Sequence, residues 1–374
     1  MKRFLFAGYA AILIALTFFS YLFVDANFMY FSSPLKGFDG QHRSLIAGTY
    51  FLLISIFFGI YIFLIKNYNL IFPNLSKLKK IIMLLLIPVF AYPAMFSYDL
   101  FNYIATSKVL FYYHENPYLV MPIDFIGEPT LMFTRAANKL ALYGIFWTFI
   151  SGIPYLLSLG NYLVSIFMFK LFAGLFYLGL VFLMWKLTKN KLSVVLFAAN
   201  PLVIIETFIS GHNDVVMMFF ALLAIYFLRN KRIFLAVIFL ILSVFIKYAT
   251  LFLVPLFLLT ILQYAKNKKI DWSRFYLLAF FSMFAIFILS FLREEIYPWY
   301  TIWPLTFLVL IPQKRKLIYL YIGLTFGLML SYIPYMYFGT YSDPTPFIKI
   351  LFMLFPPACV FLYQVIKVNK KSIL

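Results

Sequence analysis

The 374-residue sequence contains a single cysteine, Cys359, which lies in an apolar run and has no second cysteine with which to pair. A disulfide framework and a Cys/His metal cluster are therefore excluded. The GxxxxGK[ST] and GxGxxG patterns of nucleotide-binding loops are missing, and no soluble region is large enough for a nucleotide-binding fold. Since DxD, HExxH and CxxC patterns are missing too, we expect no catalytic metal, no cofactor and no direct use of a nucleotide-sugar.

Charge is also scarce: charged residues make up 11% of the chain and hydrophobic residues 65%. Apolar runs of roughly 18 or more residues recur from end to end, each long enough as a helix to cross about 30 Å of hydrocarbon. The runs lack the alternation of barrel strands, which leaves helices as the spanning element. Met1-Lys2-Arg3 and the apolar run behind it resemble a signal peptide. Because no small-residue cleavage site precedes Asp25, we expect an uncleaved first helix.

The net charge of +19 does not indicate nucleic-acid binding, because most basic residues lie in short clusters between apolar spans. Clusters of this kind are typical of cytoplasmic turns. The seven clusters are Lys2 and Arg3; Lys66, Lys77, Lys79 and Lys80; Lys186, Lys189 and Lys191; Arg229, Lys231 and Arg232; Lys266, Lys268, Lys269 and Arg274; Lys314 to Lys316; and Lys367, Lys370 and Lys371.

All seven clusters can lie inside if the chain is an all-α bundle, a single membrane domain over residues 1–374, that crosses about 12 times. The expected spans are 4–24, 46–65, 81–97, 162–185, 193–209, 215–228, 233–246, 248–263, 275–292, 301–312, 317–338 and 347–366. Both termini are then cytoplasmic in a multi-pass plasma-membrane protein. Of the 12 acidic residues, all but Asp271 then lie on or near the outer side. Acidic residues contribute little to orientation, so their collection there suggests chemistry, although outer loops also simply tolerate charge.

One outer loop, residues 98–161, is much longer than the others, and long loops are usually functional. Its segment 145–159 is moderately apolar and is interrupted by Gly152 and Pro154. The flanking charge clusters require an odd number of crossings between Lys80 and Lys186. We therefore expect 145–159 to form interfacial or re-entrant helices that do not span.

Asp99 is the first candidate for a catalytic residue. It follows the third apolar run, and Asn102, Tyr103 and Thr106 follow it at spacings of three, four and seven. In a helix this spacing places a carboxylate and several hydrogen-bonding groups on one face at the membrane boundary. The alternative is that Asp99 only caps a helix N-terminus.

The second candidate is the outer turn Gly211-His212-Asn213-Asp214. A tight turn favours Gly, Asn and Asp for their backbone conformations, but it does not require a histidine beside Asp214. Glu206 lies five residues before this turn inside an apolar run. An ionisable group within the membrane is costly and indicates function by default.

Cations and aromatic residues form the remaining candidates. Lys247 interrupts an apolar run near its outer turning point, Arg293 ends the ninth span, and Lys349 lies just inside the last span. Cations that converge at one interface can bind a lipid phosphate, although snorkelling explains any one of them. Trp299 and Tyr300 suit a sugar platform or an interfacial aromatic belt.

These motifs together resemble the GT-C superfamily of membrane glycosyltransferases, most closely the bacterial polyprenol-phosphate-mannose-dependent alpha-mannosyltransferases. The resemblance covers roughly residues 90–305 in four ordered segments. They are Tyr98-Asp99-Leu100-Phe101-Asn102-Tyr103 leading to Asn116-Pro117-Tyr118; Leu142-Tyr143-Gly144 leading to Trp147; Asn200-Pro201-Leu202 through Glu206 to Gly211-His212-Asn213-Asp214; and Lys247-Tyr248 followed by Pro298-Trp299-Tyr300.

The resemblance implies a GT-C-like fold and an extracytoplasmic active site in which Asp99 is the general base. The enzyme would move a hexose such as mannose, with inversion, from a polyprenyl-phosphate donor in the bilayer to a glycan or glycolipid acceptor. We expect Lys247, Arg293 and Lys349 to bind the donor phosphate. The acceptor or sugar would contact Asn102, Tyr103, Asn116, Tyr118, His212, Asn213, Asp214, Trp299 and Tyr300.

A transporter or flippase for lipid-linked sugars or small anions is the alternative from a different class. It explains the helices, Glu206 and Lys247 equally well. It also predicts functional polar groups throughout the membrane depth and on both sides. The expected polar groups instead collect on the outer side, which favours the glycosyltransferase, with a ligase or polymerase acting on lipid-linked saccharides as a close variant.

Overall fold

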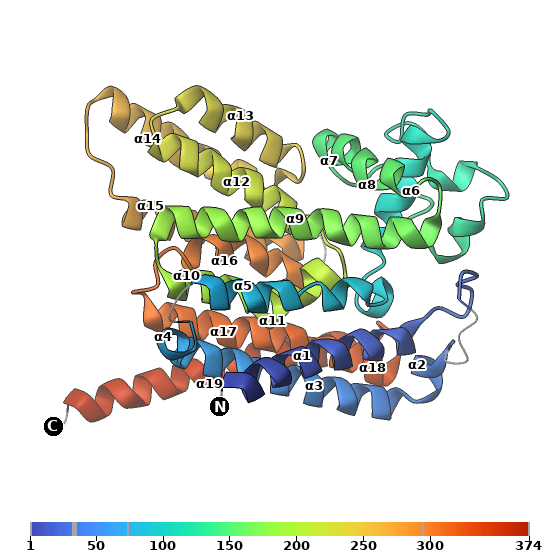
Figure 1. Ribbon diagram of the computed structural model, residues 1–374, viewed down its shortest axis with the longest axis horizontal. Coiled ribbons are helices and arrows are strands. Elements are labelled where there is room, and N and C mark those ends of the chain that lie inside the picture. Colours follow the sequence, from blue (N-terminus) through green and yellow to red (C-terminus); the bar gives the residue numbers. More distant parts are fainter. Residues whose placement is uncertain (1, 32–35, 73–74, 293–294, 373–374) are drawn as a thin grey trace.

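The computed structural model describes residues 2–31, 36–72, 75–292 and 295–372, and within these ranges the chain contains helices and no strand. Most helices lie side by side, with axes roughly along the horizontal direction of Figure 1. The α-helices are α1 (Lys2–Ser20), α2 (Phe38–Gln41), α3 (Arg43–Lys66), α4 (Tyr68–Ile71), α5 (Leu75–Leu84), α6 (Asp99–Phe111), α7 (Ile145–Ile150), α8 (Gly152–Leu157), α9 (Tyr162–Thr188), α10 (Lys191–Ala198), α11 (Pro201–Ile204), α12 (Asp214–Arg229), α13 (Ile233–Val244), α14 (Val254–Ala265), α15 (Trp272–Leu289), α16 (Ile302–Leu308), α17 (Arg315–Leu330), α18 (Ile333–Phe338) and α19 (Thr345–Ser372). The all-α fold class is confirmed.

Seven helical stretches of the described chain are long and apolar enough to cross a membrane, which makes this a multi-pass membrane protein. They are Leu5–Phe23, Arg43–Lys66, Tyr162–Thr188, Tyr248–Ala265, Trp272–Leu292, Arg315–Phe338 and Thr345–Lys367. They coincide with the expected spans 4–24, 46–65, 162–185, 248–263, 275–292, 317–338 and 347–366. An eighth span results if the bent pair Lys191–Ala198 and Pro201–Ile209, expected as 193–209, counts as one.

The other four expected spans correspond to shorter or broken helices. Range 81–97 holds the end of α5 and two 3-10 turns, while 215–228, 233–246 and 301–312 correspond to α12, α13 and α16. The 16 residues of α12 reach about 24 Å, which is less than the hydrocarbon thickness. Helix length and composition therefore support seven or eight spans, and twelve crossings remain a prediction.

The bend of 56° between the two halves of residues 191–209 follows from Asn200-Pro201. Proline has no amide proton to continue the helix, and it disfavours the helical conformation of the residue before it. Asn200 starts the second half by accepting a hydrogen bond from the Leu202 amide at 3.0 Å. Residues Ile205–Ile209 then form a π-helical turn, an irregularity often found at functional sites.

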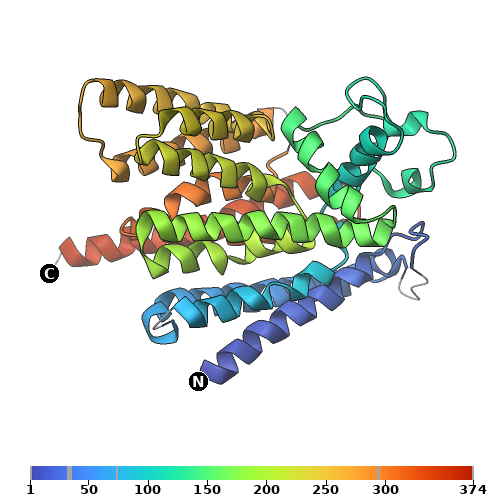
Figure 2. The same ribbon diagram turned by 45° about the horizontal axis from the view of Figure 1, so that its top comes forward.

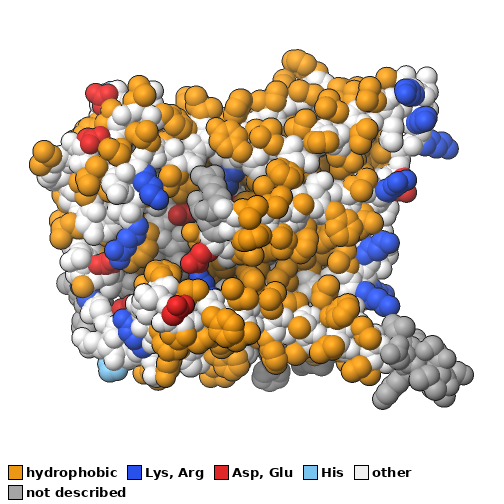
Figure 3. All heavy atoms as spheres, turned by 180° about the vertical axis from the view of Figure 1, so that it is seen from behind, with side chains coloured by type: hydrophobic (Ala, Val, Ile, Leu, Met, Phe, Trp, Pro, Cys, Tyr) orange, Lys and Arg blue, Asp and Glu red, His pale blue; other side chains and the backbone are white. Residues whose placement is uncertain are grey.

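The two ends of the bundle differ in charge. In Figures 1 and 2 both termini and the turns that follow α9, α12 and α14 lie toward the left, whereas segment 98–161 lies at the right. Figure 3 views the molecule from behind: Lys and Arg line its right edge, most acidic side chains lie on its left half, and apolar side chains cover the middle. This apolar surface suits lipid contact.

Segment 98–161 contains α6, α7 and α8 joined by irregular chain with short 3-10 turns. Glu128 connects this loop to α6, because its carboxylate accepts hydrogen bonds from Lys108 at 2.7 Å and from Tyr113 at 2.8 Å. Burial opposes ionisation of Glu128, but these bonds and one from Thr130 outweigh burial and hold its pKa below the usual value. The loop is thus a packed structure with a partly buried ion pair at its base.

Candidate active site

The turn Gly211-His212-Asn213-Asp214 packs directly against the start of α6, which carries Asp99. Gly211 has a φ of +75°, and a side chain there would place its Cβ 2.4 Å from Cδ1 of Leu100. Glycine is therefore needed both for the backbone conformation and for the close approach. The turn is also tied back to the π-helical turn, since the His212 amide donates to the carbonyl of Glu206 at 2.9 Å.

This packing aligns three ionisable side chains from distant parts of the sequence. His212 Nε2 lies 3.6 Å from Asp99 Oδ2, and His212 Nδ1 lies 3.0 Å from Glu206 Oε2. The other oxygen of Glu206 accepts a hydrogen bond from the Tyr332 hydroxyl at 2.9 Å. The side chains of His212 and Glu206 are fully buried, whereas that of Asp99 is 26% exposed. Of these three side chains, Asp99 is therefore the one that a substrate can reach.

The His212 ring is held flat against an aromatic stack. Its centroid lies 4.0 Å from that of Trp299 with an interplanar angle of 21°. Trp299 in turn stacks on Tyr297 at 4.5 Å and 8°. Stacking on Trp299 restricts movement of the imidazole, so its two nitrogens stay close to the two carboxylates.

Asp99 does not cap its helix. The capping position of α6 is Tyr98, and no side-chain capping bond is formed there. The Asp99 amide donates to the Ser97 hydroxyl at 3.1 Å, while its carboxylate faces His212. This geometry therefore does not support the alternative that Asp99 only caps a helix N-terminus.

Asp214 forms a second buried cluster beside the first. Its carboxylate accepts hydrogen bonds from Lys247 Nζ at 3.0 and 2.9 Å and from the Trp303 indole at 2.6 Å. Asp214 is fully buried and the Lys247 side chain is 14% exposed. Lys247 also lies 5.5 Å from the ring of Tyr300, which stacks on Trp303. The charge of Lys247 is thus already balanced by Asp214.

Segment 142–147 reaches this cluster through a close backbone contact. The Gly144 amide donates to the carbonyl of Ile246 at 3.1 Å, immediately before Lys247. A Cβ at position 144 would lie 2.1 Å from the Phe245 carbonyl oxygen, so only glycine fits. Tyr143 packs on Tyr103 of α6 with a centroid distance of 4.7 Å. All four segments of the sequence resemblance therefore meet in one region.

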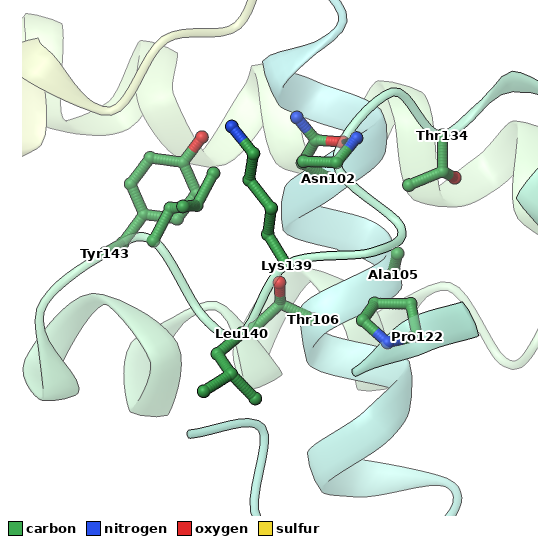
Figure 4. Close-up of a pocket in the computed structure, with 10 residues that line it drawn as sticks. Asn102, Ala105, Thr106, Pro122, Thr134, Lys139, Leu140 and Tyr143 are labelled. Carbon is green, nitrogen blue, oxygen red and sulfur yellow. Dashed lines mark hydrogen bonds between the residues drawn. The ribbon is translucent and has the colours of Figure 1, made fainter. Parts of the chain in front are cut away.

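The remaining predicted sugar contacts lie at the edge of this region or serve the loop. Asn102 accepts a hydrogen bond from the Ala136 amide at 3.1 Å, and the Tyr103 hydroxyl accepts one from the Asn213 amide at 3.4 Å. Figure 4 shows Asn102 beside a small hollow, with the side chains of Lys139 and Tyr143 directed to the same side.

Asn116 and Tyr118 belong to the packing of the loop. The Asn116 side chain accepts a hydrogen bond from the Tyr118 amide at 3.0 Å. The Tyr118 hydroxyl bonds the Tyr143 carbonyl at 2.7 Å. The Asn213 side chain is buried, and neither its Oδ1 nor its Nδ2 has a hydrogen-bond partner in the described chain.

A cleft of about 190 Å³ lies near Asp99 and His212, although neither residue is among those that line it. Tyr98 and Trp299, the neighbours of these two residues in sequence and in stacking, both line it. Lys349 lines it as well and forms an ion pair with Glu295, whereas Arg293 lies outside the described residues.

The sequence prediction missed several residues that the fold brings to the site. Arg43, at the start of α3, lines the cleft and makes no ion pair within the described ranges. Tyr332 lies in an apolar run without any distinguishing pattern, and Trp303 was expected only as one of the aromatic residues near Trp299, not as a partner of Asp214. Glu206 was noticeable as a carboxylate in an apolar run but had no predicted partner. In the part of the chain that the structure describes, no group of three His, Cys, Asp or Glu side chains is placed to hold a metal ion.

Comparison with known families identifies the chain. Residues 6–263, more than half of the sequence, match the MptA/B family, described as alpha-(1->6)-mannopyranosyltransferase, N-terminal domain. The chain belongs to this family. No curated protein and no solved structure matches it. The protein is thus a membrane mannosyltransferase of the polyprenyl-phosphate-mannose-dependent GT-C type, and the recognition made from the sequence is confirmed.

The family match of this mannosyltransferase extends through most of the site. Asp99, Glu206, His212, Asp214 and Lys247 all lie inside the matched residues. The aromatic residues at 297–303 lie beyond them and join the site only through packing on His212 and Asp214.

Proposed function

We propose that this mannosyltransferase moves mannose from a polyprenyl-phosphate donor to a hydroxyl of an extracytoplasmic glycan or glycolipid, with inversion and with Asp99 as general base. The observation that carries the proposal is the position of Asp99. Its carboxylate is partly exposed, a buried histidine lies 3.6 Å from it, and the preceding residue, Tyr98, lines a cleft. A base needs this combination of access to substrate and a fixed orientation.

The reaction follows from these positions. The acceptor hydroxyl oxygen attacks C1 of mannose while Asp99 removes the hydroxyl proton. The bond from C1 to the donor phosphate breaks, and its electrons remain on the phosphate. Direct displacement inverts the anomeric configuration, so a beta-linked donor gives an alpha-linked product. Tyr300 and Trp299 are the proposed aromatic contacts for the sugar, but the faces of Trp299 are covered by His212 and Tyr297, so only its edge is left for this role.

The donor phosphate requires cations near the cleft. We propose Lys349, Arg293 and Lys247 for this role, as expected from the sequence, and add Arg43 because it lines the cleft without a carboxylate partner among the described residues. Lys349 can serve only if the phosphate competes with Glu295, and Lys247 only if it competes with Asp214. Arg43 needs no such exchange. Cations that stabilise charge on a leaving phosphate accelerate its departure.

The site faces the extracytoplasmic side in this proposal. Segment 98–161, in which Asp99 begins α6, lies at the end of the bundle opposite the turns that follow α9, α12 and α14 (Figures 1 and 2). Basic turns are cytoplasmic in most membrane proteins. The twelve crossings and the cytoplasmic termini belong to the same proposal, with α12, α13 and α16 as short or broken crossings.

Replacing Asp99 with asparagine tests the mechanism. The amide keeps the shape of the side chain but cannot take a proton, so turnover should fall roughly 100-fold or more while donor binding is retained. The assay incubates purified protein in lipid with a radiolabelled polyprenyl-phosphate mannose and an acceptor, and counts the mannosylated product. Near-normal turnover by well-folded Asp99→Asn protein would rule out the base. Failure to transfer from any such donor would favour the transporter alternative.

A further inference from the structure

The buried imidazole of His212 lies between two carboxylates, only one of which a substrate can reach. We infer that His212 and Glu206 form a proton store behind Asp99: His212 takes over the proton that Asp99 removes from the acceptor, and Glu206 balances the charge that appears on the imidazole. This inference rests on the proposed role of Asp99. In it, His212 and Glu206 act through Asp99 and are positioning residues.

The geometry defines which nitrogen does what. Nδ1 of His212 lies 3.0 Å from Glu206 and Nε2 lies 3.6 Å from Asp99. Neither nitrogen has a hydrogen bond within the described residues, although both are completely buried. A buried imidazole without a partner is costly unless the adjacent carboxylates share its proton. We assign the proton to Nδ1, the nitrogen nearer to Glu206, which leaves Nε2 as the unprotonated nitrogen nearer to Asp99.

The surrounding structure keeps the imidazole in this position. Trp299 stacks on its face, and the π-helical turn holds both the Glu206 side chain and the Glu206 carbonyl that receives the His212 amide. Tyr332 donates to the second oxygen of Glu206 and fixes that carboxylate. A histidine that only filled space would not need a buried carboxylate beside it. Here the Glu206 carboxylate lies next to Nδ1 and is itself held by the Tyr332 hydroxyl.

Other charged groups around His212 are already neutralised or differently engaged. Asp214 is paired with Lys247, and the amine of Lys170, whose Cγ would lie 3.5 Å from a Cβ at position 211, donates to the carbonyl of Ala91. The titratable groups that contact His212, its neighbours in the turn or Glu206 are Asp99 and Tyr103 of α6, Glu206 itself, Lys170 of α9, Asp214 of α12 and Tyr332 after α17. Of these, the carboxylates of Asp99 and Glu206 are the two recorded within 4 Å of the imidazole.

The proton moves in two steps. First, the acceptor O–H bond breaks and its proton binds Asp99 as the new bond to C1 forms. Second, the proton passes from Asp99 to Nε2 of His212, and the resulting imidazolium pairs with the Glu206 carboxylate. Asp99 is then again ionised, which prevents the proton from returning to the product oxygen. After product leaves, the proton returns through Asp99, whose side chain is 26% exposed, to water. Imidazole is the side chain best suited to such exchange near neutral pH.

The test measures turnover and its pH profile for His212→Gln, Glu206→Gln and the double variant, with a synthetic polyprenyl-phosphate mannose as donor and octyl α-mannoside as acceptor. Each single variant should lose roughly tenfold to a hundredfold in kcat with little change in the donor KM. The double variant should be no worse than the poorer single variant, because both residues serve one step. The acid limb of the kcat pH profile should lie at lower pH in His212→Gln than in the wild type.

Lys170→Met is the matched control, because it removes another fully buried ionisable group that packs on the same turn. It should lower thermal stability but leave the pH profile of kcat unchanged. Wild-type kcat and pH profile in His212→Gln, together with inactive Asp99→Asn, would overturn the proton store and leave the proposed function intact. A loss in His212→Gln that matches only its loss of folded protein, with an unmoved acid limb, would also overturn it. Active Asp99→Asn would instead refute the proposed function itself.

Discussion

The pair formed by Lys247 and Asp214 allows a stability prediction that separates two roles of Lys247. In the structure Asp214 is fully buried and accepts two hydrogen bonds from Lys247 and one from Trp303. Lys247→Gln removes the only cation bonded to this carboxylate among the described residues. Breaking a buried ion pair from one side costs about 3 to 5 kcal/mol, because the remaining charge is uncompensated. We therefore expect Lys247→Gln to lower the midpoint of thermal unfolding by several degrees.

The partner variant and the double variant complete the cycle. Asp214→Asn should cost less, about 1 to 3 kcal/mol, because the amide oxygen still accepts from Trp303 and the partly exposed Lys247 amine can reach water. The double variant Asp214→Asn, Lys247→Gln should be more stable than Lys247→Gln alone, since no charge is then buried. Thermal unfolding of the purified protein in lipid nanodiscs, followed by tryptophan fluorescence, measures all four proteins.

The donor KM measured on the same proteins tests the second role. If Lys247 binds the donor phosphate, the loss of one charge-assisted contact should raise the KM about tenfold or more in both proteins that lack the lysine. An unchanged unfolding midpoint in Lys247→Gln would refute the buried ion pair as a stabilising element. An unchanged KM would remove Lys247 from the phosphate site.

Three further predictions concern the loop and the topology. Gly144→Ala should destabilise the protein by about 1 to 3 kcal/mol in thermal unfolding, because its Cβ would collide with the Phe245 carbonyl; an unchanged midpoint would contradict the close contact. A cysteine at the fully exposed Ile126 should react with an impermeant maleimide on intact cells, whereas one at Asn267 should not, and labelling at 267 would overturn the proposed orientation. Because the pKa of Glu128 is lowered, the stability that it gives the loop should be complete above about pH 4.3, its usual value, and should disappear as the pH falls through the lowered one. Limited proteolysis of residues 112–142 against pH should show this protection in the wild type and not in Glu128→Gln.

The sequence alone was sufficient to predict the membrane class, the helical fold and the family. The length of an apolar run is a property of consecutive residues, and the bend at Asn200-Pro201 follows from the missing amide proton of the proline. Both features can therefore be predicted without knowledge of distant residues. The number of membrane crossings was harder to predict from the sequence than the fold class. Charge clusters order the sides of a membrane but do not fix helix lengths: α16 is much shorter than the range 301–312 expected for it, and α13, with 12 residues, is shorter than a full crossing requires.

The pairing of charges could not be predicted from the sequence. Lys247 and Lys349 look like free cations at an interface, but tertiary packing places Asp214 and Glu295 against them. Sequence position gives no information about partners that lie 33 and 54 residues away. Arg43, by contrast, has no distinguishing pattern in the sequence. It lines the cleft because α3 packs against α17 and α18.

Residue types and local spacing therefore predicted a membrane protein with Asp99 and the turn at His212 as its polar features, and the resemblance of these motifs to a known family predicted a mannosyltransferase. Only the tertiary structure decided that they form one unit. The contact between Asp99 and His212 spans 113 positions and depends on the approach of Gly211 to Leu100, which no local pattern encodes. Burial then distinguishes the three ionisable groups, because packing leaves Asp99 accessible and encloses His212 and Glu206 completely.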